Sequence, residues 1–197
     1  MKLFDSARLL LLMALVFSVG CAGTVKTRVN TFSTPAAGSD RGTLVVLPAR
    51  EELGRSLEFA WYREKVEQVL SGLGYTPVAD REAAEFVALL DYGVEAARSD
   101  RDTYVSGGWG FGRSRYYGSS VVVVDKLDRD EYLRRVALAI ERKTPEAQRI
   151  YEVSGVSQGR CGILSVVFDE MLDAILQGFP VGNASVRTVS VRGDTRC

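Results

Sequence analysis

The 197-residue sequence contains no histidine. Histidine is the side chain that most often acts as a general base near neutral pH and most often binds transition metals. Its absence excludes Ser-His-Asp and Cys-His catalysis, and we identify no catalytic residues, metal site or cofactor motif. An excess of one charge is also lacking, because 25 Lys and Arg residues balance 25 Asp and Glu residues. No general electrostatic field therefore favours nucleic acid as a partner.

Long apolar runs are scarce, and the one near the amino terminus is short. Residues 9–17 are nine consecutive apolar residues that follow Lys2 and Arg8. A membrane-spanning helix needs about 20 such residues. The run is instead typical of a secretory signal peptide, so residues 1–20 are expected to be removed.

The segment Ser18-Val19-Gly20-Cys21 resembles the lipobox of bacterial lipoproteins. In a lipobox, small residues precede an obligatory cysteine that receives diacylglycerol and becomes the first residue of the mature chain. Leucine is commonest where Ser18 stands. The alternative is an ordinary cleaved signal peptide that leaves Cys21 as a free or bridged thiol. With Cys21 lipidated by diacylglycerol and a further acyl chain such as palmitate, attachment to the membrane is essentially permanent.

Position 22 bears on the membrane to which Cys21 attaches. It is alanine and not the aspartate that resembles an inner-membrane retention signal. We therefore expect the periplasmic face of the outer membrane. The alternatives are the periplasmic face of the inner membrane and a soluble periplasmic protein.

The other cysteines, Cys161 and Cys197, are a candidate disulfide pair in an oxidising periplasm. A bridge between them would hold the carboxyl-terminal tail. The equal alternative is that Cys161 is a small buried residue and Cys197 a frayed end. A redox-active pair is disfavoured because the two lack C-x-x-C spacing.

The mature chain is expected to form a single α+β domain with a mixed, mainly antiparallel sheet and two helices packed on one face. The domain spans residues 24–192, after a very short tether at 21–23 and before a tail at 193–197. Period-2 patterns and apolar runs predict strands, and steps of three and four residues predict helices. The predicted strands cover residues 24–32, 43–48, 83–94, 121–124, 132–142, 149–156 and 186–191, and the helices cover 56–73 and 161–179.

A flexible loop at residues 106–118 combines glycine with aromatic and basic side chains, which are enriched at binding interfaces. It could contact lipid headgroups, a glycan or an envelope protein, or its aromatic rings could fold back on the sheet edge. The side chains concerned are Trp109, Phe111, Arg113, Arg115, Tyr116 and Tyr117.

Carboxylates cluster just after this loop, at Asp125, Asp128, Asp130 and Glu131. Calcium prefers oxygen ligands on a flexible loop. The cluster lacks the glycine and the distal glutamate of a calcium-binding loop, so we favour a solvated hairpin turn.

Several short motifs resemble the bacterial lipoprotein family known as domain of unknown function 4136. They are Leu73-Gly74-Tyr75, Val78-Ala79-Asp80, and Gln177-Gly178-Phe179-Pro180 followed by the strand at 186–191. The resemblance spans nearly the whole mature chain. It implies an anchored envelope protein of mixed α and β structure with no established activity, and it supplies no catalytic residues.

The leading hypothesis is a non-enzymatic envelope lipoprotein that acts as an interaction or assembly module, with an envelope protein or glycan as partner. The alternative is a small-ligand carrier, or an enzyme that uses paired carboxylates. The carboxylates concerned are Asp91 with Asp125 or Glu141. A third hypothesis is a structural protein that coats the membrane.

Overall fold

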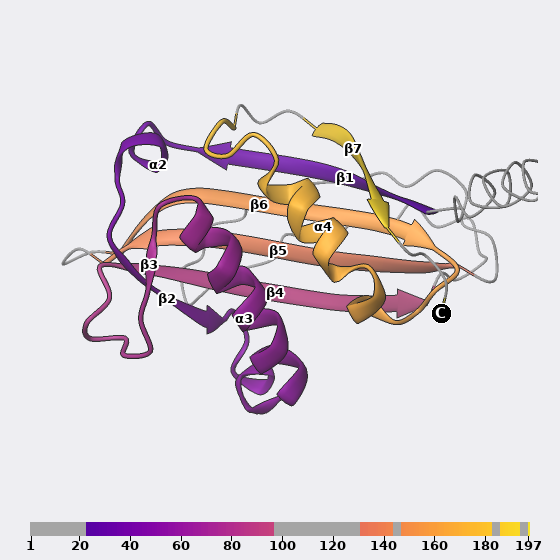
Figure 1. Cartoon of the computed structure of the whole chain (residues 1–197), viewed down its shortest axis with the longest axis horizontal. Helices are drawn as coiled ribbons and strands as arrows, with labels where there is room; N and C mark the ends of the chain where they lie inside the picture. The colour runs from indigo at the N-terminus through magenta and orange to yellow at the C-terminus, as the bar shows by residue number, and fades with distance from the viewer. Residues whose placement is uncertain (1–22, 97–130, 144–146, 183–185, 194–196) are drawn as a thin grey trace, which may run out of the picture.

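Seven strands form one sheet in the order β3-β2-β4-β5-β6-β1-β7 (Figure 1). The computed structural model describes residues 23–96, 131–143, 147–182, 186–193 and 197. The strands are β1 (Gly23–Ser33), β2 (Thr43–Pro48), β3 (Thr76–Pro77), β4 (Phe86–Ala96), β5 (Tyr132–Arg142), β6 (Gln148–Gly159) and β7 (Val186–Gly193). With helices on one face of this mixed sheet, the predicted α+β class is confirmed.

Most neighbouring strands are antiparallel. Strands β4, β5 and β6 form an antiparallel meander, and β1 lies antiparallel between β6 and β7. Strand β2 instead runs parallel to both β3 and β4. Parallel strands need a long crossover connection, and the chain between β2 and β3 contains one of the two long helices.

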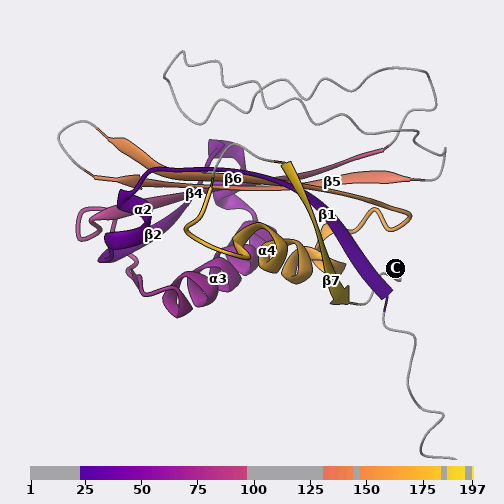
Figure 2. The same ribbon diagram turned by 90° about the horizontal axis from the view of Figure 1, so that it is seen from above.

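Helices α3 (Leu57–Gly72) and α4 (Phe168–Leu176) cover the same face of the sheet (Figure 2). The short α2 (Ala36–Ser39) and the 3₁₀ helices η1 (Glu51–Arg55) and η2 (Leu164–Val166) complete the described elements. None of the described helices is long and apolar enough to span a membrane.

Helix α3 begins and ends at identifiable signals. The Ser56 hydroxyl accepts hydrogen bonds from the backbone N–H groups of Glu58 and Phe59, at 3.0 and 3.3 Å. This N-cap satisfies donors that have no partner within the helix. After the helix, Gly74 adopts a φ of 95°, a left-handed conformation that favours glycine. The helix therefore extends close to the predicted residues 56–73.

Helix α4 is shorter than the predicted 161–179. Gly162 lies against the ring of Tyr132, where a Cβ would approach a ring atom to 2.8 Å. Ile163 has extended backbone angles, φ −99° and ψ 109°. The chain therefore passes the Tyr132 end of β5 in an extended conformation before η2 and α4 begin, a constraint that periodicity does not reveal.

The main core lies between the sheet and the two helices. The rings of Tyr62 on α3 and Phe168 on α4 stack with their centroids 4.0 Å apart. On β5, Val136, Leu138 and Ile140 are fully buried in this core. Intervening alanines of β5 point to the opposite face, as the alternating pattern predicts. We call this opposite face the second face of the sheet.

Candidate functional site

On the second face, basic side chains of the β4-β5-β6 meander are paired with carboxylates. Arg149 contacts Glu141 and Glu152, each at 2.9 Å. Arg135 is ion-paired with Glu95 across β4 and β5. These pairs compensate the basic side chains that β5 and β6 place on the second face.

Asp91 is the most buried carboxylate on these strands, with its side chain 3% exposed. Arg50, which follows β2, donates to Asp91 Oδ1 at 2.9 Å and to the Tyr92 carbonyl at 2.8 Å. Burial raises the pKa of Asp91, and the Arg50 guanidinium opposes that rise. Arg50 thus compensates a carboxylate that burial would otherwise destabilise.

The carboxylates predicted as an acid-base pair do not converge. In the β4-β5 register, Asp91 lies opposite Ala137, whereas Glu141 lies opposite Val87. The two positions are four residues apart along the strands, about 13 Å. Asp125, the other predicted partner, lies outside the described residues. Within the described ranges, no group of three or more His, Cys, Asp or Glu residues could hold a metal ion.

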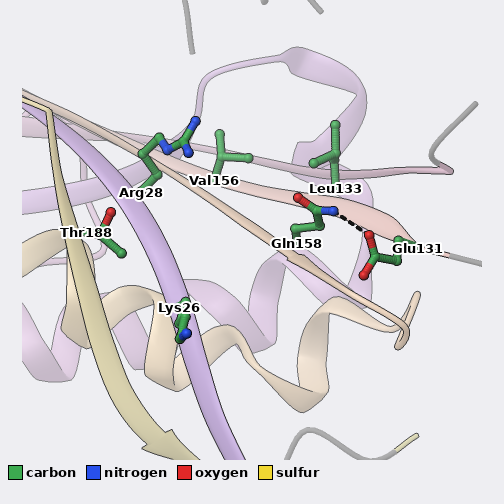
Figure 3. Close-up of a pocket in the computed structure, with 7 residues that line it drawn as sticks. All are labelled: Lys26, Arg28, Glu131, Leu133, Val156, Gln158 and Thr188. Atoms are coloured by element: carbon green, nitrogen blue, oxygen red, sulfur yellow. Dashed lines mark hydrogen bonds between the residues drawn. The ribbon is translucent and has the colours of Figure 1, made fainter. Parts of the chain in front are cut away.

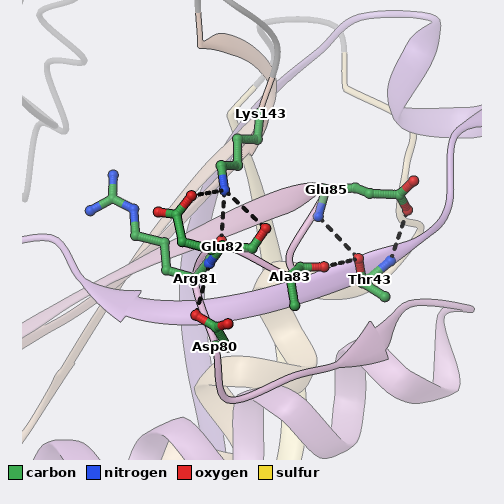
Figure 4. A network of polar contacts seen from close by, with 7 residues as sticks. All are labelled: Thr43, Asp80, Arg81, Glu82, Ala83, Glu85 and Lys143. Carbon is green, nitrogen blue, oxygen red and sulfur yellow. Dashed lines mark hydrogen bonds and ion pairs between the residues drawn. The ribbon is translucent and has the colours of Figure 1, made fainter.

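A network of hydrogen bonds and ion pairs lies where β2 begins (Figure 4). The Thr43 backbone N–H donates to Glu85 Oε2 at 3.1 Å, and its hydroxyl donates to the Ala83 carbonyl at 2.9 Å. Lys143 Nζ, just after β5, donates to the Arg81 carbonyl at 2.9 Å and to Glu82 Oε2 at 3.2 Å. These contacts attach the turn before β4 to its neighbouring strands, and their charges are compensated locally.

Strands β1 and β7 differ in charge from the rest of the sheet. Together they contain four basic residues and no acidic residue. Lys26 and Arg28 alternate on β1, and Arg192 lies opposite Thr24. Cross-strand partners point to the same side of a sheet, so these three basic side chains share the second face. None of them forms an ion pair or hydrogen bond with the described residues.

A pocket of about 330 Å³ opens beside this basic surface (Figure 3). Leu133 and Val156 supply apolar lining, and the Gln158 amide donates to the Glu131 carboxylate at the β5 side. The volume is at the lower end of the range for small-molecule sites. The seven lining residues are Lys26, Arg28, Glu131, Leu133, Val156, Gln158 and Thr188.

A buried arginine lies at the same end of the sheet but on the core face. Arg134 is 3% exposed, and its guanidinium donates to Ser157 Oγ at 3.1 Å and to the Cys161 carbonyl at 3.5 Å. No carboxylate among the described residues pairs with it, and burial lowers its pKa. Gly159 leaves the space that the guanidinium fills, because a Cβ there would lie 2.5 Å from an arginine nitrogen.

The structure joins Cys161 to Cys197 in a disulfide with Cα atoms 5.3 Å apart. The bond connects the segment after β6 to the residue that ends the chain after β7. It lies at the end of the sheet where β1 begins and β7 ends (Figure 1).

Most predicted interaction residues lie outside the described part of the chain. This applies to Cys21 and to the loop at 106–118, with Trp109, Phe111, Arg113, Arg115, Tyr116 and Tyr117. It also applies to Asp125, Asp128 and Asp130. Glu131 is described, and it lines the pocket beside Gln158. Neither the loop nor the acidic turn is tested by the structure.

The sequence pattern predicted that one face of residues 24–32 is exposed, but it assigned no role to Lys26 or Arg28. The overlooked signal is the absence of acidic residues from both terminal strands. Arg192 and Thr188 join the same surface only through the β1-β7 register, which the sequence alone does not specify.

Comparisons with known proteins give limited information. No protein-family model matches the chain, and no curated protein matches it. A PDZ domain protein from Parabacteroides distasonis is 14% identical, with 91% of this chain and 42% of that chain covered and a TM-score of 0.48. The chain therefore spans less than half of that protein.

Two smaller solved structures are also similar. The PelC dodecamer from Paraburkholderia phytofirmans is 13% identical, with 76% of this chain and 94% of that chain covered and a TM-score of 0.41. A protein of the family of domain of unknown function 4136, from Bacteroides thetaiotaomicron, is 14% identical, with coverages of 78% and 94% and a TM-score of 0.40. The latter belongs to the family that the sequence motifs resemble. These similarities assign no function.

Proposed function

We propose that this protein is an envelope lipoprotein, anchored to a membrane through Cys21, that acts as a non-enzymatic interaction module at the membrane surface. The observation that carries the proposal is the position of β1. The strand begins at Gly23, where it is already paired with Gly193. Only Ala22 separates Cys21 from the sheet, so the two Cα atoms of Cys21 and Gly23 are within about 7 Å.

This short connection has a geometric consequence. A domain on a long tether samples a large volume around its anchor. Here the β1-β7 end of the sheet is held next to the bilayer, and the second face is presented close to membrane components. The ion pairing of Asp91 and the separation of Asp91 from Glu141 support a non-catalytic role, as does the absence of histidine.

Acylation and membrane association test the anchor. The full chain and its Cys21→Ser variant would be expressed in a Gram-negative bacterium, labelled with an alkyne fatty acid and fractionated on a density gradient. We expect the wild-type chain to carry the label and to float with membranes, and Cys21→Ser to lose both properties. The Cys161→Ser/Cys197→Ser variant is the matched control, because it removes cysteines but keeps Cys21. An unlabelled wild-type chain would overturn the proposal.

In-cell photocrosslinking tests the interaction. A photoreactive amino acid would replace Thr188, on the second face, or Glu64, on the solvent side of α3. We expect adducts with envelope protein, glycan or lipid from position 188 and few from position 64. A chain that gives no adduct from position 188, or equal adducts from both, contradicts an interaction role for the second face.

A further inference from the structure

We propose that Lys26, Arg28 and Arg192 bind the phosphates of anionic phospholipid headgroups in the membrane that holds the Cys21 anchor. This inference rests on the proposed function for the location of the domain. The ligand and the surface that binds it follow from the charge, the geometry and the position of these residues.

Strands β1 and β7 carry basic side chains without acidic neighbours on the same strands. On the β4-β5-β6 meander, Arg135 and Arg149 have carboxylate partners within the same sheet. Strands β1 and β7 have no acidic residue with which their basic residues could pair. Among the described residues, Lys26, Arg28 and Arg192 therefore have no carboxylate partner.

Hydroxyl groups lie beside these basic side chains on the second face. Lys26 lies opposite Ser190, and Arg28 lies opposite Thr188, so each cation has a hydroxyl neighbour on the same face. Arg28 and Thr188 line the pocket with Lys26 (Figure 3). Guanidinium, ammonium and hydroxyl groups all donate hydrogen bonds, and arginine in particular recognises phosphate oxygens with two parallel donors. The arrangement complements a phosphate and not a cation.

The proximity of these side chains to the Cys21 anchor favours a lipid phosphate over a free one. Lys26 follows Cys21 by five residues, at most about 17 Å of extended chain. Thr24, opposite Arg192, is closer still. Basic residues near an anionic bilayer are attracted to it within about one Debye length, 8 to 10 Å from the surface. An acyl chain at Cys21 would bring these side chains towards that layer.

The Glu131 carboxylate is the acidic group in the same pocket. It accepts from the Gln158 amide and lies at the β5 side, whereas Lys26 and Arg28 come from β1. Among the described residues of this surface, the three cations outnumber the acid, and the expected net attraction is for anions.

Vesicle binding tests the proposal. The chain of residues 21–197 with Cys21→Ser would be mixed with phosphatidylcholine vesicles, or with vesicles of equal phosphatidylglycerol and phosphatidylcholine, and sedimented. We expect binding to the phosphatidylglycerol vesicles that weakens at high salt. Lys26→Gln and Arg28→Gln should each weaken binding about five-fold, and the triple variant with Arg192→Gln about 100-fold.

A charge-matched control separates the site from general electrostatics. Arg55→Gln, Arg63→Gln and Arg81→Gln together remove the same charge away from β1 and β7, and binding should change less than about three-fold. Thermal unfolding would establish that both triple variants are folded, and the single variants serve as the readout if a triple variant is not.

Three results would overturn the proposal. They are equal binding to phosphatidylcholine vesicles, equal losses in the two triple variants, and displacement from vesicles by inorganic phosphate at constant ionic strength, which would assign the site to a free anion. Because Cys21 is serine in every chain used, failure here is distinct from a failure of acylation in cells.

Discussion

The β4-β5-β6 meander and the β1-β7 pair belong to one sheet, but the basic side chains that they place on the second face differ in their carboxylate partners. In the meander, Arg135 and Arg149 are neutralised by carboxylates on the same or neighbouring strands. In the β1-β7 pair, Lys26 and Arg28 have no acidic neighbour on either strand. Carboxylates compensate Arg135 and Arg149 in one region, whereas Lys26 and Arg28 in the other have no ion-pair partner among the described residues.

The largest expected effect on stability comes from removing the disulfide next to the end of β7. Replacing both Cys161 and Cys197 by alanine should lower the free energy of unfolding by about 4 kcal/mol, because the bridge closes a loop with a sequence separation of 36. Urea unfolding of the Cys21→Ser chain with and without the two replacements would measure it. An unchanged free energy would show that backbone pairing and packing alone hold the β1-β7 pair.

The next effect tests charge compensation in the meander. Arg50→Ala should destabilise the protein by about 2 kcal/mol, because it leaves the buried Asp91 carboxylate without its cation. Arg63→Ala removes an exposed partner of Glu67 at 3.6 Å and should cost less than about 0.5 kcal/mol. Chemical unfolding of the two variants provides the comparison, and equal losses would contradict the assigned role of Arg50.

The loss of stability caused by Arg50→Ala should depend on pH. Burial already raises the pKa of Asp91, and loss of Arg50 removes a group that opposes this rise. A carboxyl group with a raised pKa binds a proton more tightly in the folded state, so stability falls as pH rises through that range. The destabilisation by Arg50→Ala should therefore be larger at about pH 7 than at about pH 4. The same loss at both pH values would exclude the ionisation of Asp91 as its cause.

A similar loss is expected at the boundary between the two regions. Gly155 of β6 lies opposite Val29 of β1, and a Cβ there would be 2.4 Å from Ile175 Cγ2 and 2.9 Å from Thr27 Cγ2. Gly155→Ala should cost about 2 kcal/mol through overpacking. Gly93→Ala, with nothing within 4 Å of its Cβ, should be neutral or slightly stabilising. Thermal unfolding of both variants checks this, and a neutral Gly155→Ala would mean that α4 can shift away from β6.

The smallest expected effect is a difference in stability between variants that replace one lysine from each region. Lys143→Met removes hydrogen bonds to the turn before β4 and should lower stability by up to about 1 kcal/mol. Lys26→Met should leave stability unchanged or raise it slightly, because it reduces repulsion with Arg28. Urea midpoints would detect the difference. A larger loss for Lys26→Met would show that Lys26 has a stabilising role within the fold.

Local pattern predicted much of this fold. Strands β2 and β5 have the predicted bounds, because each has a clear alternation or a sharp apolar boundary. The spacing of Phe59, Tyr62, Val66 and Leu70 likewise predicted the buried side of α3. These signals depend on neighbours within a few residues, which a sequence displays directly.

Long-range relations were not accessible in the same way. Alternation showed that Lys26 and Arg28 share a face, but only the register brings Arg192 beside them, more than 160 residues later. The Arg50 contact with Asp91 depends on the parallel pairing of β2 with β4, which no local pattern specifies. The sequence thus displays the residues of the candidate site, but it does not show that they lie together on one surface.

The position of β1 between β6 and β7 also affects the order in which the sheet assembles during folding. Thr27 pairs with Ser157 on one side and with Val189 on the other. Ser157 and Val189 follow Thr27 by 130 and 162 residues along the chain. Contacts of such long sequence separation form slowly. Strand β1 therefore stays unpaired on both sides until β6 and β7 have been synthesised.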